Sequence, residues 1–100
     1  MQRRPLTSEQ IRAARALIRW RAEDLAKASA VSVATIRRAE LQEGRTGMTL
    51  PNDLAIRGAL EAAGVEFIDE NGGGPGVRLR KGAPSGADIR RRPKEGARGE

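Results

Sequence analysis

Residues 25–40 of this 100-residue chain read LAKASAVSVATIRRAE, and this segment predicts two short helices joined by a tight turn. Ser32 suits the N-cap of the second helix, because its hydroxyl can accept a hydrogen bond from a backbone N–H two or three residues further on. Val31 and Ile36 then occupy the N′ and N4 positions of a hydrophobic staple, which fixes the direction in which that helix starts.

With Ile36 turned inward, the remaining side chains of the second helix lie on or near its outward side. Small residues at the start of this surface let the helix approach another molecule closely, and two arginines follow. A helix-turn-helix needs these features to lay its recognition helix in the major groove of DNA. The outward residues are Val33, Ala34, Thr35, Arg37 and Arg38.

A further helix is predicted before this segment, over residues 8–19. Thr7 as N-cap and Gln10 at N3 match a capping box, in which each side chain accepts from the backbone N–H of the other. The inward stripe of this helix contains Arg15, which is either a solvated charge or a buried partner of Glu40. We favour the buried pair, since it would tie the first helix to the third.

The other helices carry weaker signals. Residues 22–28 predict the second helix, although Arg21 cannot cap it by accepting a hydrogen bond. We assign Trp20 to the core rather than to stacking on a base. A loop over residues 41–50 leads to a fourth helix over residues 52–63, which Gly64 ends. Gly58 inside that helix predicts a close contact with another helix.

After Gly64 the pattern changes to short β-type runs. Residues 65–69 and 77–80 flank a glycine-rich loop and predict a β-hairpin. Because an isolated two-stranded hairpin is barely stable, it must pack on the helices or be continued by a second copy. The loop neither opens a helix nor carries the Lys-Ser/Thr of a P-loop, so we give phosphate binding there little weight. Residues 81–100 predict a disordered basic tail, whose arginines at 90–92 are either solvated or seek phosphate.

Composition limits the classes of function. The formal net charge of +6 favours a polyanionic partner. Without Cys or His, thiol catalysis, disulfides and the usual zinc sites are excluded, and no catalytic arrangement is recognisable, so we expect neither an enzyme nor a cofactor. There is no apolar run long enough to span a bilayer and no signal-peptide pattern, which predicts a cytoplasmic protein without membrane contact.

Several ordered motifs together resemble the Cro/repressor-type (XRE) helix-turn-helix regulators, and in particular a small bacterial group of them. These are RAARAL at 12–17, VSVATIRRAE at 31–40, ALEAAGVEFI at 59–68 and GGGPGVRL at 72–79. The resemblance covers about residues 6–80. It implies a mainly α fold, with a compact four-helix DNA-binding domain over residues 6–64 and a hairpin over residues 65–80 that can serve in dimerisation.

The resemblance also assigns roles to residues. It places a structural ion pair at Arg15 and Glu40. The family's GWSQ junction is replaced by residues 19–22 here, so Arg19 and Arg21 would contact phosphates by charge instead. Ala30 stands where glycine is common. The third helix, the recognition helix, is predicted from Val33 to about Leu41, and it lacks the glycine that usually ends it, which predicts a longer helix. The base-reading positions are Val33, Ala34, Thr35 and Arg37, and the predicted backbone contacts are Arg19, Arg21, Ser32, Arg38 and Arg45.

Two functions from different classes follow. The first is a sequence-specific double-stranded DNA-binding transcriptional regulator, a repressor by class, acting as a homodimer because one recognition helix reads only a few base pairs. The alternative is an antitoxin or adaptor whose main partner is another protein, docked on the hairpin or the basic tail. RNA binding is less favoured, since the chain lacks an aromatic stacking platform. No ligand-sensing domain is visible, so no small-molecule ligand is expected.

Overall fold

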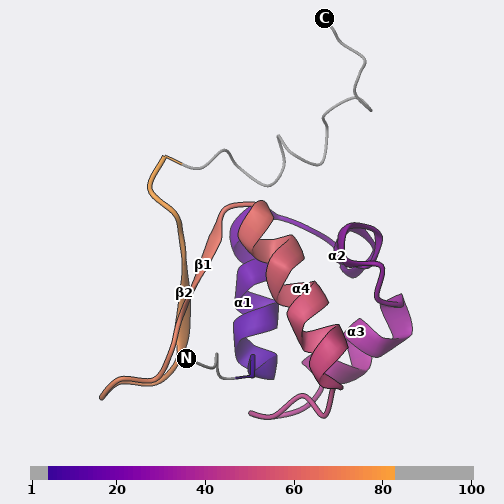
Figure 1. Ribbon diagram of the computed structural model, residues 1–100, viewed down its shortest axis with the longest axis horizontal. Coiled ribbons are helices and arrows are strands. Elements are labelled where there is room, and N and C mark those ends of the chain that lie inside the picture. Colours follow the sequence, from indigo (N-terminus) through magenta and orange to yellow (C-terminus); the bar gives the residue numbers. More distant parts are fainter. Residues whose placement is uncertain (1–4, 83–100) are drawn as a thin grey trace, which may run out of the picture.

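The fold is mainly helical and ends in a β-hairpin, as the sequence predicts (Figure 1). The computed structural model describes residues 5–82. Residues 83–100, which include the arginines of the predicted tail, and residues 1–4 lie outside this range. The elements are α1 (Ser8–Ile18), α2 (Ala22–Ser29), α3 (Val33–Glu40), α4 (Leu50–Ala62), β1 (Val65–Ile68) and β2 (Gly76–Leu79).

The start of α1 is fixed by the predicted capping box. The Thr7 hydroxyl accepts from the Gln10 backbone N–H at 3.1 Å, and Gln10 Oε1 accepts from the Thr7 backbone N–H at 3.0 Å. The first four N–H groups of a helix have no intrahelical partners, and this reciprocal pair satisfies two of them, so it sets the first residue of the helix. The helix ends at Ile18, because Arg19 adopts a left-handed conformation with φ of 59°.

α2 and α3 are joined by residues 30–32. Ala30 has φ of 62°, so this non-glycine residue accepts the strain of a left-handed turn. The Ser32 hydroxyl then accepts from the Thr35 backbone N–H at 3.1 Å, which confirms the predicted cap of α3. The helix ends at Glu40 with Leu41 as its C-cap, within one residue of the predicted end, and the longer helix expected from the missing glycine is wrong.

At the start of α2, a cap is supplied from inside the helix. The Asp24 carboxylate accepts from the backbone N–H of Arg21 at 2.8 Å. This contact satisfies one backbone donor at the helix start without any help from the Arg21 side chain.

Two expectations for α4 need correction. The helix begins at Leu50 rather than at residue 52, because the Thr49 hydroxyl accepts from the Asn52 backbone N–H at 3.3 Å and Pro51 fits the first turn. The predicted close helix contact at Gly58 is wrong. A Cβ added there would meet nothing within 4 Å, since Ile56 and Leu60 turn inward and Gly58 lies on the exposed face.

The core is built from aliphatic side chains of every helix and of β1. Trp20 lies among them with only 7% of its surface exposed, so its assignment to the core is confirmed. The staple pair Val31 and Ile36, predicted from the sequence, is buried as well. The larger members of the core are Leu6, Ile11, Ile18, Trp20, Leu25, Val31, Ile36, Ile56, Leu60 and Val65.

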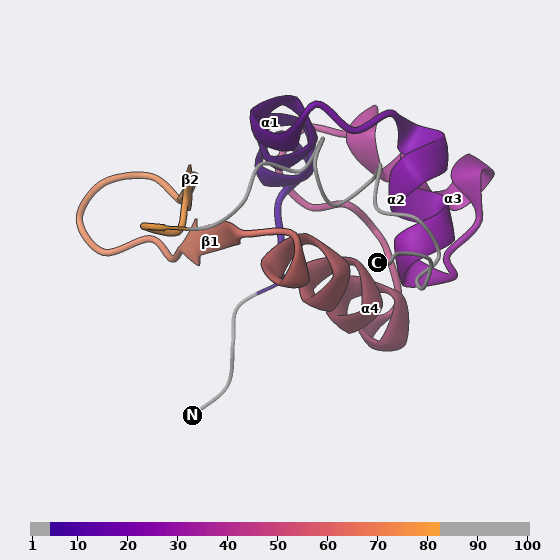
Figure 2. The same cartoon turned by 90° about the horizontal axis from the view of Figure 1, so that it is seen from above.

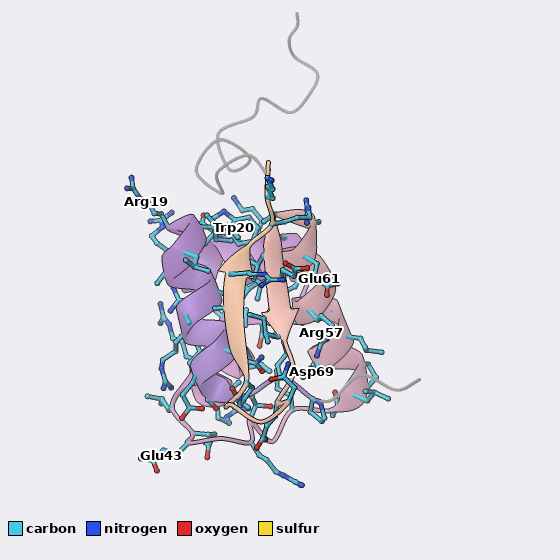
Figure 3. The ribbon with its side chains drawn as sticks, turned by 90° about the vertical axis from the view of Figure 1, so that its left-hand side faces the viewer. Arg19, Trp20, Glu43, Arg57, Glu61 and Asp69 are labelled. Carbon is cyan, nitrogen blue, oxygen red and sulfur yellow. The ribbon has the colours of Figure 1, made fainter. Side chains whose placement is uncertain are left out.

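The hairpin is antiparallel and packs on α1 and α4, as expected of a hairpin that cannot stand alone. Phe67 faces Val77 across the strands, and both pack against the core. Gln10 Nε2 donates to the Gly76 carbonyl at 3.0 Å, which fastens the hairpin to α1. Figure 3 shows the two strands in front of α1 and α4.

A buried arginine joins α4 to this hairpin. The guanidinium of Arg57 lies 5.2 Å from the centre of the Phe67 ring, and its Nη1 is 3.9 Å from a carboxylate oxygen of Glu61. Figure 3 shows Arg57 and Glu61 on the side of α4 next to the strands. The burial of this charged residue was not predicted from the sequence.

The hairpin and α3 lie on opposite sides of the molecule. In both Figure 1 and Figure 2 the strands are at the far left and α3 is at the right, with α1 and α4 between them. Within residues 5–82, no helix has the length and apolar content needed to cross a bilayer.

Candidate nucleic-acid interface

The outer surface of α3 carries the residues that the sequence singled out. Ala34, Arg37 and Arg38 are exposed, whereas Val33 and Thr35 are half-buried. Val33 packs against the core, and the Thr35 hydroxyl accepts from the Ser32 hydroxyl at 2.9 Å. The part of α3 most open to a partner is therefore formed by Ala34 and the two arginines.

The predicted ion pair between Arg15 and Glu40 is present and fixes the end of α3 to α1. Arg15 Nε and Nη2 donate to the two carboxylate oxygens of Glu40 at 2.6 and 2.7 Å, a bidentate geometry. Arg15 Nη1 also donates to the Trp20 carbonyl at 2.8 Å. The hydrogen bond to Glu40 raises the pKa of Arg15 despite its partial burial, and the charges of Glu40, Glu23 and Asp24 act in the same direction.

Two further contacts join α1 to the last turn of α3. The Ser8 hydroxyl donates to the Ala39 carbonyl at 2.5 Å, and Arg12 Nη1 donates to the Glu40 carbonyl. These carbonyls belong to the helix end that lacks intrahelical donors, so α1 supplies the missing partners. Sequence reasoning missed both contacts.

A cleft of about 570 Å³ opens beside α3, between the end of α1 and the start of α2, and we name it the arginine cleft. Five arginines and two glutamates line it, an excess of three positive charges. Such a concentration of charge attracts polyanions. The charged lining residues are Arg12, Arg15, Arg19, Arg21, Arg37, Glu23 and Glu40.

The cleft brings together some of the predicted backbone contacts. Arg19 and Arg21 line it from the junction of α1 and α2, and Arg37 lines it from α3. Figure 3 shows Arg19 at the outer corner of the molecule, pointing away from it. Arg12 was not singled out from the sequence. The sequence nevertheless indicates that Arg12 lies on the same helix face as Arg15 and Arg19, because residues 12, 15 and 19 are three and four residues apart.

Arg37 is joined to α2 by an ion pair that was not predicted. Its Nη2 donates to Glu23 Oε2 at 2.7 Å, and the two side chains are 60% and 51% exposed. Glu23 lies in the first turn of α2, where a carboxylate also suits the helix dipole. The partners are 14 residues apart on different helices, so no helical periodicity links them in the sequence. The packing of α2 on α3 brings them together.

The remaining predicted contacts lie elsewhere. Arg38 and Thr35 line a smaller cleft of about 150 Å³ between α3 and the start of α4. Arg45 is exposed in the following loop, where it forms a β-bridge with Thr7 and lines a third cleft beside the hairpin turn. The structure therefore does not gather Arg45 with Arg19 and Arg21.

Comparisons with protein-family models, with curated proteins and with solved structures find no match. Within residues 5–82, no three or more acidic, His or Cys residues are grouped so that they could hold a metal ion. The function is therefore inferred from the arrangement of α3 and the arginine cleft.

Proposed function

We propose that the protein is a sequence-specific double-stranded DNA-binding regulator of the Cro/repressor (XRE) type. In this proposal α2 and α3 form a helix-turn-helix, and α3 is the recognition helix that enters the major groove. The observation that carries the proposal is the exposed surface of α3, with Ala34, Arg37 and Arg38, directly beside the arginine cleft. A short capped helix with a small residue and cations on its open side suits the width and charge of that groove.

The chemistry of recognition follows from these side chains. The Arg37 guanidinium can donate two parallel hydrogen bonds to O6 and N7 of guanine, and the methyl groups of Ala34 and Thr35 suit the methyl group of thymine. Arg19, Arg21 and Arg38 neutralise phosphates and release counterions, which supplies affinity without sequence information. Arg45 is a more distant backbone contact under this proposal.

A single copy of α3 reads only a few base pairs, so the proposal includes a homodimer. Two copies present two recognition helices about one helical turn of DNA apart, which doubles the sequence that is read. The hairpin lies on the opposite side of the molecule from α3, so an assembly through the hairpin leaves α3 uncovered (Figure 2).

Selection from a random duplex library at near-physiological salt tests the proposal. The retained duplexes should share a motif, and a palindromic motif would give the half-site spacing of a dimer. Retention without any motif would contradict sequence-specific binding and favour the antitoxin or adaptor alternative.

A matched pair of variants tests whether α3 is the surface that contacts DNA. Ala34→Glu adds a negative charge on exposed α3, and Ala62→Glu adds the same charge at the exposed end of α4. The first should abolish retention and the second should preserve it. Equal behaviour of the two variants would remove α3 from the interface.

A further inference from the structure

Glu23 places a negative charge on the surface that the proposed function assigns to DNA. It lies in the first turn of α2 and lines the arginine cleft, where its carboxylate accepts from Arg37 Nη2 at 2.7 Å. A carboxylate beside a bound duplex repels its phosphates, so affinity alone disfavours glutamate at this position.

Fold stability does not account for Glu23 either. Both side chains of the pair are more than half exposed, and ion pairs of this kind stabilise folded proteins little. The start of α2 already has Asp24, whose carboxylate accepts from the Arg21 backbone N–H at 2.8 Å. Capping of α2 therefore does not depend on Glu23.

We propose that Glu23 is a positioning residue for Arg37 and thereby sets base specificity, an inference that rests on the proposed function. A guanidinium carries five N–H donors in a planar fork, and Glu23 accepts from Nη2 alone. Arg37 therefore keeps enough N–H donors to bind O6 and N7 of a guanine while Glu23 holds its side chain in place. Holding Arg37 reduces the conformational freedom that it loses on binding, and it keeps Arg37 from turning to the nearest phosphate.

Neutralising Glu23 should move affinity and discrimination in opposite directions. In Glu23→Gln the arginine cleft gains one unit of positive charge, so affinity for any duplex rises and its salt dependence steepens. Arg37 is less well held, so discrimination at its base position falls by about two- to fivefold, the range expected of an exposed ion pair. A role in stability alone would move neither quantity in this way.

The experiment measures dissociation constants of the full chain for the selected duplex and for duplexes that carry one substituted base pair each. The variants are Glu23→Gln, Arg37→Ala and the double variant. Glu66→Gln is the matched control, because Glu66 forms an exposed ion pair of the same 2.7 Å length with Arg78 on the hairpin. It removes the same charge on the opposite side of the molecule from α3 (Figure 1).

Glu23→Gln should lose discrimination at one base position, Glu66→Gln at none, and Glu23→Gln should add no further loss once Arg37 is Ala. Unchanged discrimination in Glu23→Gln, or an equal loss in Glu66→Gln or in the Arg37→Ala background, would overturn the inference while the proposed function stands. A wild-type protein that selects no motif would overturn the proposed function itself, and the inference with it.

Discussion

Ala30 is one of two non-glycine residues with a left-handed backbone in the described part of the chain. Ala30 turns the chain between α2 and α3 with φ of 62°, a conformation that costs an L-residue roughly 1–2 kcal/mol and glycine little. Ala30→Gly should therefore raise the free energy of unfolding by about 1 kcal/mol, after allowance for the greater freedom of glycine in the unfolded chain. Urea denaturation measures this as a higher midpoint with an unchanged slope.

Ala28 provides the control for that prediction. It is an exposed residue inside α2 with regular helical geometry, so Ala28→Gly should lower stability by about 1 kcal/mol. The same substitution two residues apart then has opposite signs. A shift in the same direction at both sites would show that left-handed strain does not limit stability at Ala30.

Asp53 makes a second prediction at the scale of one residue. It is buried, and its Oδ1 accepts from the backbone N–H of Leu6 at 3.0 Å. Asp53→Ala leaves that N–H buried without a partner and should lower the free energy of unfolding by about 1–3 kcal/mol. Asp53→Asn keeps an acceptor oxygen and should cost much less. Equal losses in the two variants, measured by urea denaturation, would mean that the charge of Asp53 matters rather than its oxygen.

Side-chain contacts could be predicted from the sequence only where a pattern or the family resemblance pointed to both partners. Arg15 lies in the apolar stripe of α1 and Glu40 ends the predicted recognition helix, and this pair is present. Asp53 gave no such signal, because its partner is a backbone group 47 residues away. A backbone N–H has no side chain that marks it in a sequence.

At the scale of elements, prediction succeeded where the signals are local. Thr7 with Gln10, and Ser32 with Thr35, fix helix starts through contacts only three residues apart. Burial of Arg57 could not be predicted in this way. Its guanidinium lies over the Phe67 ring of the hairpin, which tertiary packing and not a local pattern brings next to α4.

The recognition helix carries its own prediction. Arg37→Ala should flatten discrimination at one base position by about 1–3 kcal/mol, because a guanine contact is lost there. Arg45→Ala should instead lower affinity to a similar extent for every duplex, since Arg45 is assigned to the backbone. Competition binding against duplexes with single substitutions separates the two outcomes. A uniform loss in Arg37→Ala would reassign this residue to a phosphate.

At the scale of the whole molecule, the positive charge on the side of the arginine cleft should govern how DNA affinity depends on salt concentration. Arg21 is exposed in the arginine cleft, whereas Arg78 is exposed on the hairpin beyond α1 and α4 (Figure 2). Arg21→Gln should reduce the slope of log affinity against log salt concentration by about one, because one phosphate contact is lost. Arg78→Gln should leave the slope unchanged. Equal slopes in the two variants would mean that only net charge attracts the duplex.

The side-chain contacts described above between α1 and α3 reach the last turn of α3, from Ser8, Arg12 and Arg15. α3 is thus supported at both ends, by α1 at its carboxyl end and by Val33 in the core near its amino end. A substitution at Ser8 removes one support of the carboxyl end, and any resulting change in the tilt of α3 would move Ala34 as well, because both lie on one short helix.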